Sequence, residues 1–203
     1  MRLYDKHILP YLTHKICSLS PATRQRQKII PFAEGKILEI GIGSGLNLPH
    51  YNKKKVKYIW GLDPSTELWA RSGITNGELP FPFQFLPTSA EQIPLENNSV
   101  DSIVVTYTLC SIPDIHTALN EMRRVLKPGG KLFFSEHGTA PDNHIRTLQN
   151  ILNPVWTIFS GGCQLNRNIP ELLKESGFEF EQLEAMYIPG WKFASYNFWG
   201  VAI

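Results

Sequence analysis

The sequence lacks the features that mark three large classes of protein. Its three cysteines are scattered and contain no CxxC pair, which excludes a disulfide scaffold and gives no metal-binding spacing. Its 20 Lys and Arg residues nearly balance its 18 Asp and Glu residues, so we expect no nucleic-acid partner. Its most apolar stretch, residues 103–112, is far shorter than the about 20 residues that span a bilayer.

What remains fits an ordinary globular protein. With 203 residues, of which 42% are hydrophobic, the chain is long enough to bury one core, and its formal net charge of +2 is too small for bulk disorder. No repeat or low-complexity tract interrupts it. We therefore expect a single-domain, cytoplasmic protein, and the composition alone indicates no chemistry. The sequence contains no signal for an oligomeric state.

The first 34 residues differ from the rest in charge and pattern. They hold six Lys or Arg residues against two acids, and their charged residues 5–7 interrupt the apolar stretch that a signal peptide needs. Pro10 is expected to kink a helix whose apolar residues share one stripe, namely Leu3, Tyr4, Ile8, Tyr11, Leu12, Ile16 and Leu19. Residues 1–34 are therefore expected to form either a helical lid or a segment that binds the inner membrane surface, ahead of a domain formed by residues 35–203.

From residue 36 onward, short apolar runs alternate with helical patterns. This alternation predicts an α/β fold, a mostly parallel sheet with helices on both faces. Two last strands, at 178–188 and 191–201, are expected to pair antiparallel at the sheet edge. The remaining predicted strands lie at 36–40, 57–62, 83–87, 102–106 and 131–136, and the predicted helices at 64–72, 115–126, 142–162 with an interruption at Pro154, and 170–176.

A glycine-rich turn follows the first predicted strand. Gly41, Gly43 and Gly45 alternate after Glu39, which lets the backbone turn sharply, approach a ligand and expose amides at the start of a following helix. Glycine turns also arise simply to connect a strand to a helix. Leu46 stands where a dinucleotide-binding motif would need glycine, which counts against NAD or FAD.

An acidic residue follows the second predicted strand. Asp63 lies 18 positions beyond Gly45, close to the roughly 20-residue interval at which such folds place an acid on ribose hydroxyls. Because it directly precedes Pro64, Asp63 could instead be the N-cap of the next helix.

Taken together, several segments resemble class I S-adenosylmethionine-dependent methyltransferases. They are the turn 37–45, Asp63, Ser89-Ala90-Glu91, the turn 97–101 and Leu126-Lys127-Pro128-Gly129-Gly130. The resemblance covers residues 35–137 and implies a Rossmann-like seven-stranded sheet in the order 3-2-1-4-5-7-6, with the seventh strand antiparallel.

The resemblance also implies a cofactor site. S-adenosylmethionine, converted to S-adenosylhomocysteine, is the expected cofactor, and no metal is expected. Gly41, Gly43 and Gly45 would lie against its methionine part and Asp63 would hold the ribose. The adenine would be bordered by Ser89, Ala90 and Glu91, and Thr106 would face the methyl group; Glu39 completes the expected cofactor-binding set.

A narrower resemblance concerns the acceptor. Leu109-Cys110-Ser111, Phe134-Ser135-Glu136-His137, Trp156 and the segment 161–167 resemble the methyltransferase-like proteins that S-methylate alkyl thiols and the type 11 methyltransferase group. Those thiol enzymes carry an N-terminal hydrophobic membrane anchor, whereas this chain has a shorter amphipathic segment.

The chemistry needs few protein groups. The sulfonium of the cofactor is already activated, so the protein mainly aligns an acceptor with the methyl group, and a thiol acceptor is already partly ionised. His137, just past the fifth strand, is the candidate base, although it could equally be a loop histidine held by hydrogen bonds. The candidate substrate-binding residues are Tyr11, Cys110, Trp156, Phe159 and Arg167. Methyl transfer needs no covalent enzyme intermediate, so Cys110 and Cys163 are not expected to be nucleophiles.

We therefore expect a methyltransferase that acts on a small, fairly apolar acceptor, with a thiol preferred. A lipid or quinone methyltransferase is the alternative within the same chemistry. A protein that binds the cofactor without catalysis, and a nicotinamide oxidoreductase, are the alternatives of other classes.

Overall fold

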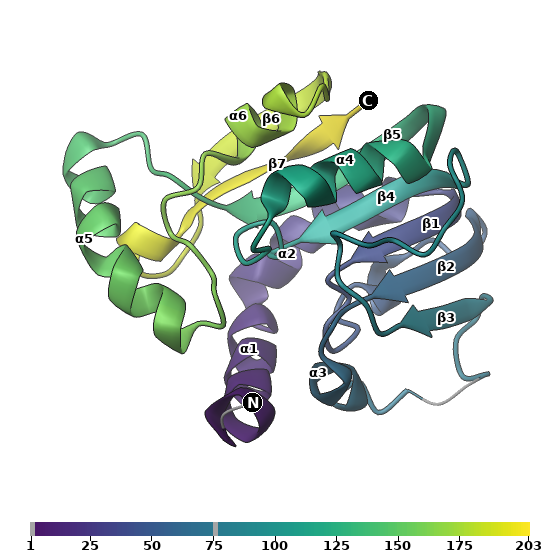
Figure 1. Cartoon of the computed structure of the whole chain (residues 1–203), viewed down its shortest axis with the longest axis horizontal. Helices are drawn as coiled ribbons and strands as arrows, with labels where there is room; N and C mark the ends of the chain where they lie inside the picture. The colour runs from purple at the N-terminus through teal and green to yellow at the C-terminus, as the bar shows by residue number, and fades with distance from the viewer. Residues whose placement is uncertain (1–2, 75–76) are drawn as a thin grey trace.

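The computed structural model describes residues 3–74 and 77–203 and contains one seven-stranded sheet. Its order is β3-β2-β1-β4-β5-β7-β6, and β7 runs antiparallel to both of its neighbours (Figure 1). The predicted order and the antiparallel last pair are confirmed. The strands are β1 (Gly35–Ile40), β2 (Val56–Leu62), β3 (Phe83–Leu86), β4 (Val100–Thr106), β5 (Leu126–His137), β6 (Phe180–Tyr187) and β7 (Tyr196–Ala202).

The two central strands, β1 and β4, contain runs of consecutive apolar residues where an alternation of apolar and polar residues would mark a strand with one solvated face. Neighbouring residues of a strand point to opposite faces, so a strand that is covered on both faces favours apolar residues at successive positions. Ile37 and Leu38 are both fully buried, yet they belong to core clusters on opposite faces of the sheet. Each such side chain stabilises the fold by about 1.5–3 kcal/mol.

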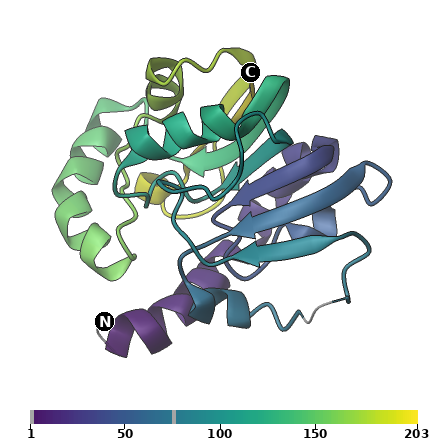
Figure 2. The same cartoon turned by 45° about the vertical axis from the view of Figure 1, so that its right-hand side comes forward.

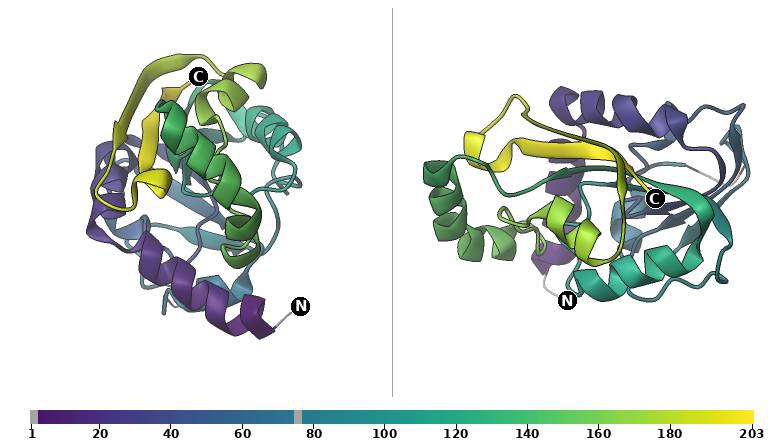
Figure 3. Two further views of the ribbon diagram at one scale, coloured as in Figure 1. Left: turned by 90° about the vertical axis from the view of Figure 1, so that its left-hand side faces the viewer. Right: turned by 90° about the horizontal axis from the view of Figure 1, so that it is seen from above.

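Helices cover both faces and the carboxyl ends of the parallel strands. Figure 3 shows α2 (Ser20–Ile29) on one face of the sheet and α4 (Ile115–Val125) on the other. α1 (Leu9–Cys17), α3 (Thr66–Ala70) and α5 (Asn143–Phe159) lie beyond the strand ends (Figure 2). The remaining helices are α6 (Ile169–Glu175), the π-helix η1 (Tyr4–Ile8) and the short 3₁₀ helices η2 (Ile30–Phe32), η3 (Leu48–His50) and η4 (Lys192–Ala194).

α4 has the clearest sequence signature of these helices. Asp114 caps its start, because the side chain accepts a hydrogen bond from the Thr117 amide at 3.1 Å. Its buried residues, Ile115, Ala118, Leu119, Met122 and Val125, share one face. Arg123 and Arg124 stand in the last turn, where positive charge favours the helix dipole.

The N-terminal helix changes from a π-helical turn to an α-helix close to Pro10. The turn η1 gives way to α1 at Leu9, and Pro10 occupies the first turn of α1. The kink itself stays a prediction. No helix among the described residues is long and apolar enough to cross a membrane.

Three local predictions need correction. The glycine-rich turn leads through turns into the 3₁₀ helix η3 and not into an α-helix. α5 runs through Pro154 without interruption, because Pro154 and Asn150 are both exposed and solvent can hydrate the carbonyl that the proline leaves unpaired. β5 begins five residues early: after Leu126 pairs with Val100, residues 127–130 bulge out and the register resumes at Lys131.

Candidate active site

The carboxyl ends of β1, β2, β4 and β5 meet at one edge of the sheet. In open α/β sheets the ligand crevice lies beyond these ends. Here α1, α3 and α5 surround that edge, as Figures 1 and 2 show. The predicted site residues must therefore be judged by how they are arranged at this edge.

The glycine turn requires glycine for two reasons. Gly41, Gly43 and Gly45 all have positive φ, at 67°, 54° and 74°, a conformation that residues with a Cβ rarely adopt. In addition, a Cβ on Gly41 would lie 2.1 Å from Oγ1 of Thr108. The turn thus packs directly against the segment that follows β4.

Asp63 ties the end of β2 to this turn. Its Oδ2 accepts a hydrogen bond from the Gly43 amide at 3.0 Å, and its Oδ1 accepts one from the Ser65 amide at 2.8 Å. Ser65, and not Asp63, is the N-cap of α3, so the capping alternative for Asp63 is wrong. The carboxylate is nearly buried, which raises its pKa. Each oxygen keeps a lone pair for a further donor, which fits the hydroxyls of a ribose.

Both carboxylate oxygens of Glu39 have a side chain as their partner. One carboxylate oxygen accepts from Asn47 Nδ2 at 3.0 Å, and the other from the Tyr51 hydroxyl at 2.7 Å. Burial raises the pKa of Glu39 to about 7. The same Asn47 amide reaches Oγ1 of Thr106 at 3.1 Å, so Glu39 and Thr106 are joined beneath the glycine turn. Asn47 and Tyr51 were missed by sequence reasoning, because no motif distinguishes a supporting side chain.

The loop after β3 holds the predicted adenine residues. Ala90 is buried, while Ser89 and Glu91 are half-buried. Glu91 accepts a hydrogen bond from the amide of Asp114, the N-cap of α4, at 3.3 Å. The loop is thereby fixed to the helix that follows β4.

α1 covers the glycine turn. His14 Nδ1 lies 2.8 Å from Oγ of Ser44, and the Arg71 guanidinium lies 5.6 Å from the centre of the Tyr11 ring. At the other end of this N-terminal helix, the Tyr4 hydroxyl donates to the carbonyl of Phe159 in α5. The N-terminal segment therefore contacts both the cofactor-side turn and the far end of α5.

Cys110, His137 and Cys163 converge at the ends of β4 and β5. Their sulfur and ring nitrogen atoms all lie within 4.8 Å of one another, and Nε2 of His137 lies 3.1 Å from Sγ of Cys163. The Cys110 thiol and the His137 imidazole hold the pKa of Cys163 well below its usual range, although burial opposes this. Burial lowers the pKa of His137 while the Cys163 charge raises it, and the net shift is upward.

Two charged residues support this cluster, and only one of them was predicted. Arg167 donates to the carbonyls of Leu109 and Ile112, the latter at 2.7 Å, so its guanidinium holds the turn that carries Cys110. Glu136 was not predicted; its Oε1 accepts from the amides of Thr108 at 2.7 Å and Leu109 at 3.1 Å. Burial raises the pKa of Glu136 to about 7.

The two predicted aromatic residues of α5 differ in their placement. The ring of Trp156 packs edge-on against Phe193 with centres 5.9 Å apart. Phe159 is 62% exposed, and its ring packs on Tyr4. Trp156 thus borders the cysteine cluster, which its indole faces, while Phe159 lies on the outer surface.

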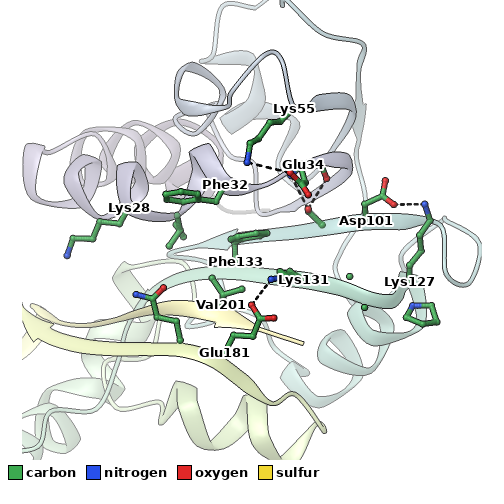
Figure 4. A pocket seen from close by; sticks show the side chains of 16 residues that line it. Lys28, Phe32, Glu34, Lys55, Asp101, Lys127, Lys131, Phe133, Glu181 and Val201 are labelled. Atoms are coloured by element: carbon green, nitrogen blue, oxygen red, sulfur yellow. Dashed lines mark hydrogen bonds and ion pairs between the residues drawn. The ribbon is translucent and has the colours of Figure 1, made fainter.

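A groove of about 520 Å³ lies at the opposite edge of the sheet, near the start of β1 and β4 (Figure 4). Three of its four lysines, Lys55, Lys127 and Lys131, are each paired with an acid, at 3.5, 2.5 and 2.6 Å from Glu34, Asp101 and Glu181. The fourth, Lys28, lies over the ring of Trp199 at 4.7 Å. The groove therefore offers an anion an excess of only one positive charge, and it stands apart from the crevice.

Comparison with known proteins agrees with this geometry. The sequence profile of a family described as a methyltransferase domain matches residues 38–134. The thiol S-methyltransferase TMT1B of Rattus norvegicus is 29% identical, covering 88% of this chain and 78% of the relative. A demethylmenaquinone methyltransferase of Thermotoga maritima is also 29% identical and covers 90% of both. The solved structure of a SAM-dependent methyltransferase from Thermotoga maritima has a TM-score of 0.63 at 20% identity, covering 99% of this chain and 95% of that chain.

Proposed function

This chain is an S-adenosylmethionine-dependent methyltransferase, and we propose that it transfers the methyl group to the sulfur atom of a small, fairly apolar thiol. The observation that carries this proposal is how much of the chain is similar to a thiol S-methyltransferase. That similarity covers 88% of the chain and so extends well beyond residues 38–134, into the segment that supplies His137, Trp156 and Cys163. These residues stand on the acceptor side of the crevice.

We assign the cofactor to the ends of β1 and β2. The glycine turn lets the backbone approach the methionine part, and Asp63 accepts hydrogen bonds from the ribose. Ser89, Ala90 and Glu91 border the adenine, and Thr106 faces the methyl group. We assign Glu39 the support of this site through Asn47 and Tyr51, because it is only 1% exposed and both of its carboxylate oxygens accept from these side chains. The bound cofactor supplies a methyl group that its sulfonium has already activated.

On the acceptor side, the protein has to exclude water and accept one proton. Trp156 and Cys110 line the acceptor pocket, and Arg167 positions the turn that carries Cys110. His137 is our candidate for the group that takes the thiol proton. With that proton removed, the acceptor sulfur would take the methyl group from the bound cofactor, which would leave as S-adenosylhomocysteine.

Incubation with labelled S-adenosylmethionine and a panel of thiols, amines, phenols and phospholipids tests the acceptor. We expect label in thioethers. Label found only in nitrogen or carbon acceptors would contradict a thiol substrate, and tight cofactor binding without any labelled product would favour a protein that only binds the cofactor. Asp63→Asn should weaken cofactor binding about tenfold or more, because a charge-assisted hydrogen bond is worth roughly 1.5–3 kcal/mol, whereas Glu67→Gln nearby should not.

A lipid or quinone acceptor is the second candidate, favoured by an exposed apolar surface and by the similarity to a demethylmenaquinone methyltransferase. The surface consists of Ile8, Tyr11, Ile16 and Leu19 near α1 and of Ile151, Val155, Ile158 and Phe159 on α5, all at least 48% exposed. Such a surface would let the N-terminal segment, residues 1–34, rest on a bilayer. We favour the lid, because α1 is packed on the glycine turn.

Vesicle flotation separates these two roles of residues 1–34. If the segment is a lid, the full chain should not float with anionic vesicles and should remain at the bottom of the gradient. Flotation that is abolished by Ile16→Glu, at an exposed position of α1, would instead establish membrane binding.

A further inference from the structure

Three segments far apart in the sequence bring two cysteines and one histidine to one place. Cys110 follows β4, His137 ends β5 and Cys163 follows α5, so these residues are 27 and 26 positions apart. Their potential ligand atoms lie within 4.8 Å of one another. This spacing contains no CxxC signal, which is why the sequence predicted no metal.

The cluster is held in place by hydrogen bonds that use none of the three potential ligand atoms. The amide of Gln164 donates to the Cys110 carbonyl at 2.9 Å, which joins the two cysteine loops directly. Arg167 fixes the carbonyls on both sides of Cys110, and the Ser160 hydroxyl donates to the Cys163 carbonyl at 3.2 Å. The backbone is therefore set before any ligand arrives, which lowers the entropic cost of binding.

The ligand atoms also match one kind of ion. Zn²⁺ binds cysteine sulfur at about 2.3 Å and histidine nitrogen at about 2.0 Å in a tetrahedron, so its ligand atoms stand roughly 3.3–3.8 Å apart. Atoms that already lie within 4.8 Å need only small side-chain rotations to reach this arrangement. Nδ1 of His137 is buried and has no hydrogen-bond partner among the described residues, so nothing else fixes the ring through that atom.

We propose that Cys110, His137 and Cys163 bind one zinc ion, with the fourth position left open. Three protein ligands and an open position are typical of catalytic zinc, whereas structural zinc has four protein ligands. Cys17, at the end of α1, lies within electrostatic range of Cys163 but is not part of the cluster, which makes it the natural control.

The open position gives the site a role that rests on the proposed thiol acceptor, whereas the zinc site itself does not. The acceptor thiol binds zinc as its thiolate and releases its proton to water, since a coordinated thiol is deprotonated. Its lone pair then forms the new bond to the methyl carbon as the cofactor C–S bond breaks, giving a thioether and S-adenosylhomocysteine. In the zinc-loaded enzyme, His137 is a zinc ligand and not the base. Coordination to zinc then removes the proton of the acceptor thiol.

Metal binding to the reduced full-length protein tests the site without cofactor or acceptor. Titration with Zn²⁺ against a chromophoric chelator should show one equivalent bound. Cys163→Ser and His137→Gln should each lower the affinity by more than about a hundredfold, because even partners outside the first coordination sphere are worth 10–100-fold. Cys17→Ser and His144→Gln, outside the cluster, should leave it unchanged. Co²⁺ should give the visible spectrum of a tetrahedral thiolate site.

A measurement on the unmodified protein covers the case in which a variant fails to fold. Zn²⁺ should slow the alkylation of Cys110 and Cys163, read by peptide mass spectrometry, and leave that of Cys17 unchanged. Absence of stoichiometric zinc, equal protection of all three cysteines, or an equal loss of affinity in Cys17→Ser would overturn the proposal. These results leave thiol methylation itself untouched, which the labelled-cofactor assay decides separately.

Discussion

The two halves of the crevice are built differently. In the half that we assign to the cofactor, each carboxylate oxygen of Asp63 and Glu39 has a protein donor. In the half that we assign to the acceptor, Glu136 Oε2 and His137 Nδ1 are buried without hydrogen-bond partners in the chain as described. An unpaired buried polar group costs about 1–3 kcal/mol. The cofactor half is thus complete in the sense that each of these oxygens already has a protein partner, while the acceptor half contains buried polar atoms that have none.

This difference suggests that substitutions in the cofactor half act mainly on stability and those in the acceptor half mainly on specificity. A complete half tolerates little change, because any substitution leaves a partner unsatisfied. An incomplete half can change its residues at a smaller cost to the fold, and it gains most from a ligand that satisfies its free groups. Variants of the two halves should therefore differ in what they damage, and the following four predictions run from the largest expected effect to the smallest.

The strongest test of the complete half is Gly41→Ala. The new Cβ would meet Thr108 at 2.1 Å in a left-handed conformation, which should cost about 4 kcal/mol from overpacking and backbone strain together. Gly73→Ala is the matched control, because Gly73 has a φ of 65° but nothing within 4 Å of its Cβ position. It should cost only about 1–2 kcal/mol. Equal losses in urea unfolding would show that the turn does not pack on Thr108 as described.

The buried carboxyl of Glu39 should make stability depend on pH. Its pKa of about 7 lies above the unfolded value of 4.5, so the folded state holds the proton more tightly. This contribution is fully present below about pH 4.5 and is lost as the pH rises through about 7, a change on the order of 3 kcal/mol. Glu39→Gln should remove this part of the slope from thermal or urea unfolding of the cofactor-free protein, while Glu136, whose pKa is also raised to about 7, keeps its own part.

Glu34→Gln is the control for this pH series, because the Glu34 side chain is 65% exposed. It should leave the slope unchanged. An unchanged slope in Glu39→Gln as well would mean that the carboxyl is hydrated, and that the cofactor half is less complete than its hydrogen bonds indicate.

Arg167→Met should affect the acceptor half alone. Loss of two hydrogen bonds to carbonyls should cost about 2 kcal/mol and loosen the turn that carries Cys110. We expect a lower kcat/KM for the thiol and an unchanged affinity for S-adenosylmethionine, measured by calorimetry. Arg24→Met, at an exposed position of α2, serves as the control. A cofactor affinity that fell together with kcat/KM would show that the two halves act as one unit.

His14→Ala should have the smallest effect. It removes one part-buried contact of 2.8 Å between α1 and Ser44, worth about 1 kcal/mol, so the cofactor should dissociate roughly fivefold faster in stopped-flow measurements. His7→Ala, exposed on the preceding π-helical turn, should not change this rate. Slower dissociation in His14→Ala would show that α1 does not cover the cofactor.

How far the sequence predicts each half follows from the same difference. The glycine turn and Asp63 lie within 25 residues, their strands have unmistakable apolar runs, and together they resemble a known family, so this half and the sheet order could be predicted. The acceptor half is assembled from residues more than 25 positions apart, and no local pattern announces that Cys110 and Cys163 meet. Supporting residues such as Asn47 and Glu136 are ordinary polar side chains whose roles come only from burial. Pro154 was misjudged because exposure, which a sequence does not display, decides whether a helix tolerates proline.

The N-terminal segment contacts two separate parts of the molecule, and this bears on turnover if the segment is the lid proposed above. Through His14 and Tyr4 it reaches the glycine turn and the end of α5. Displacement of such a lid would release both products in a single opening event. The rate of that event, and not the separate affinities of the two products, would then place an upper limit on how often the enzyme can cycle.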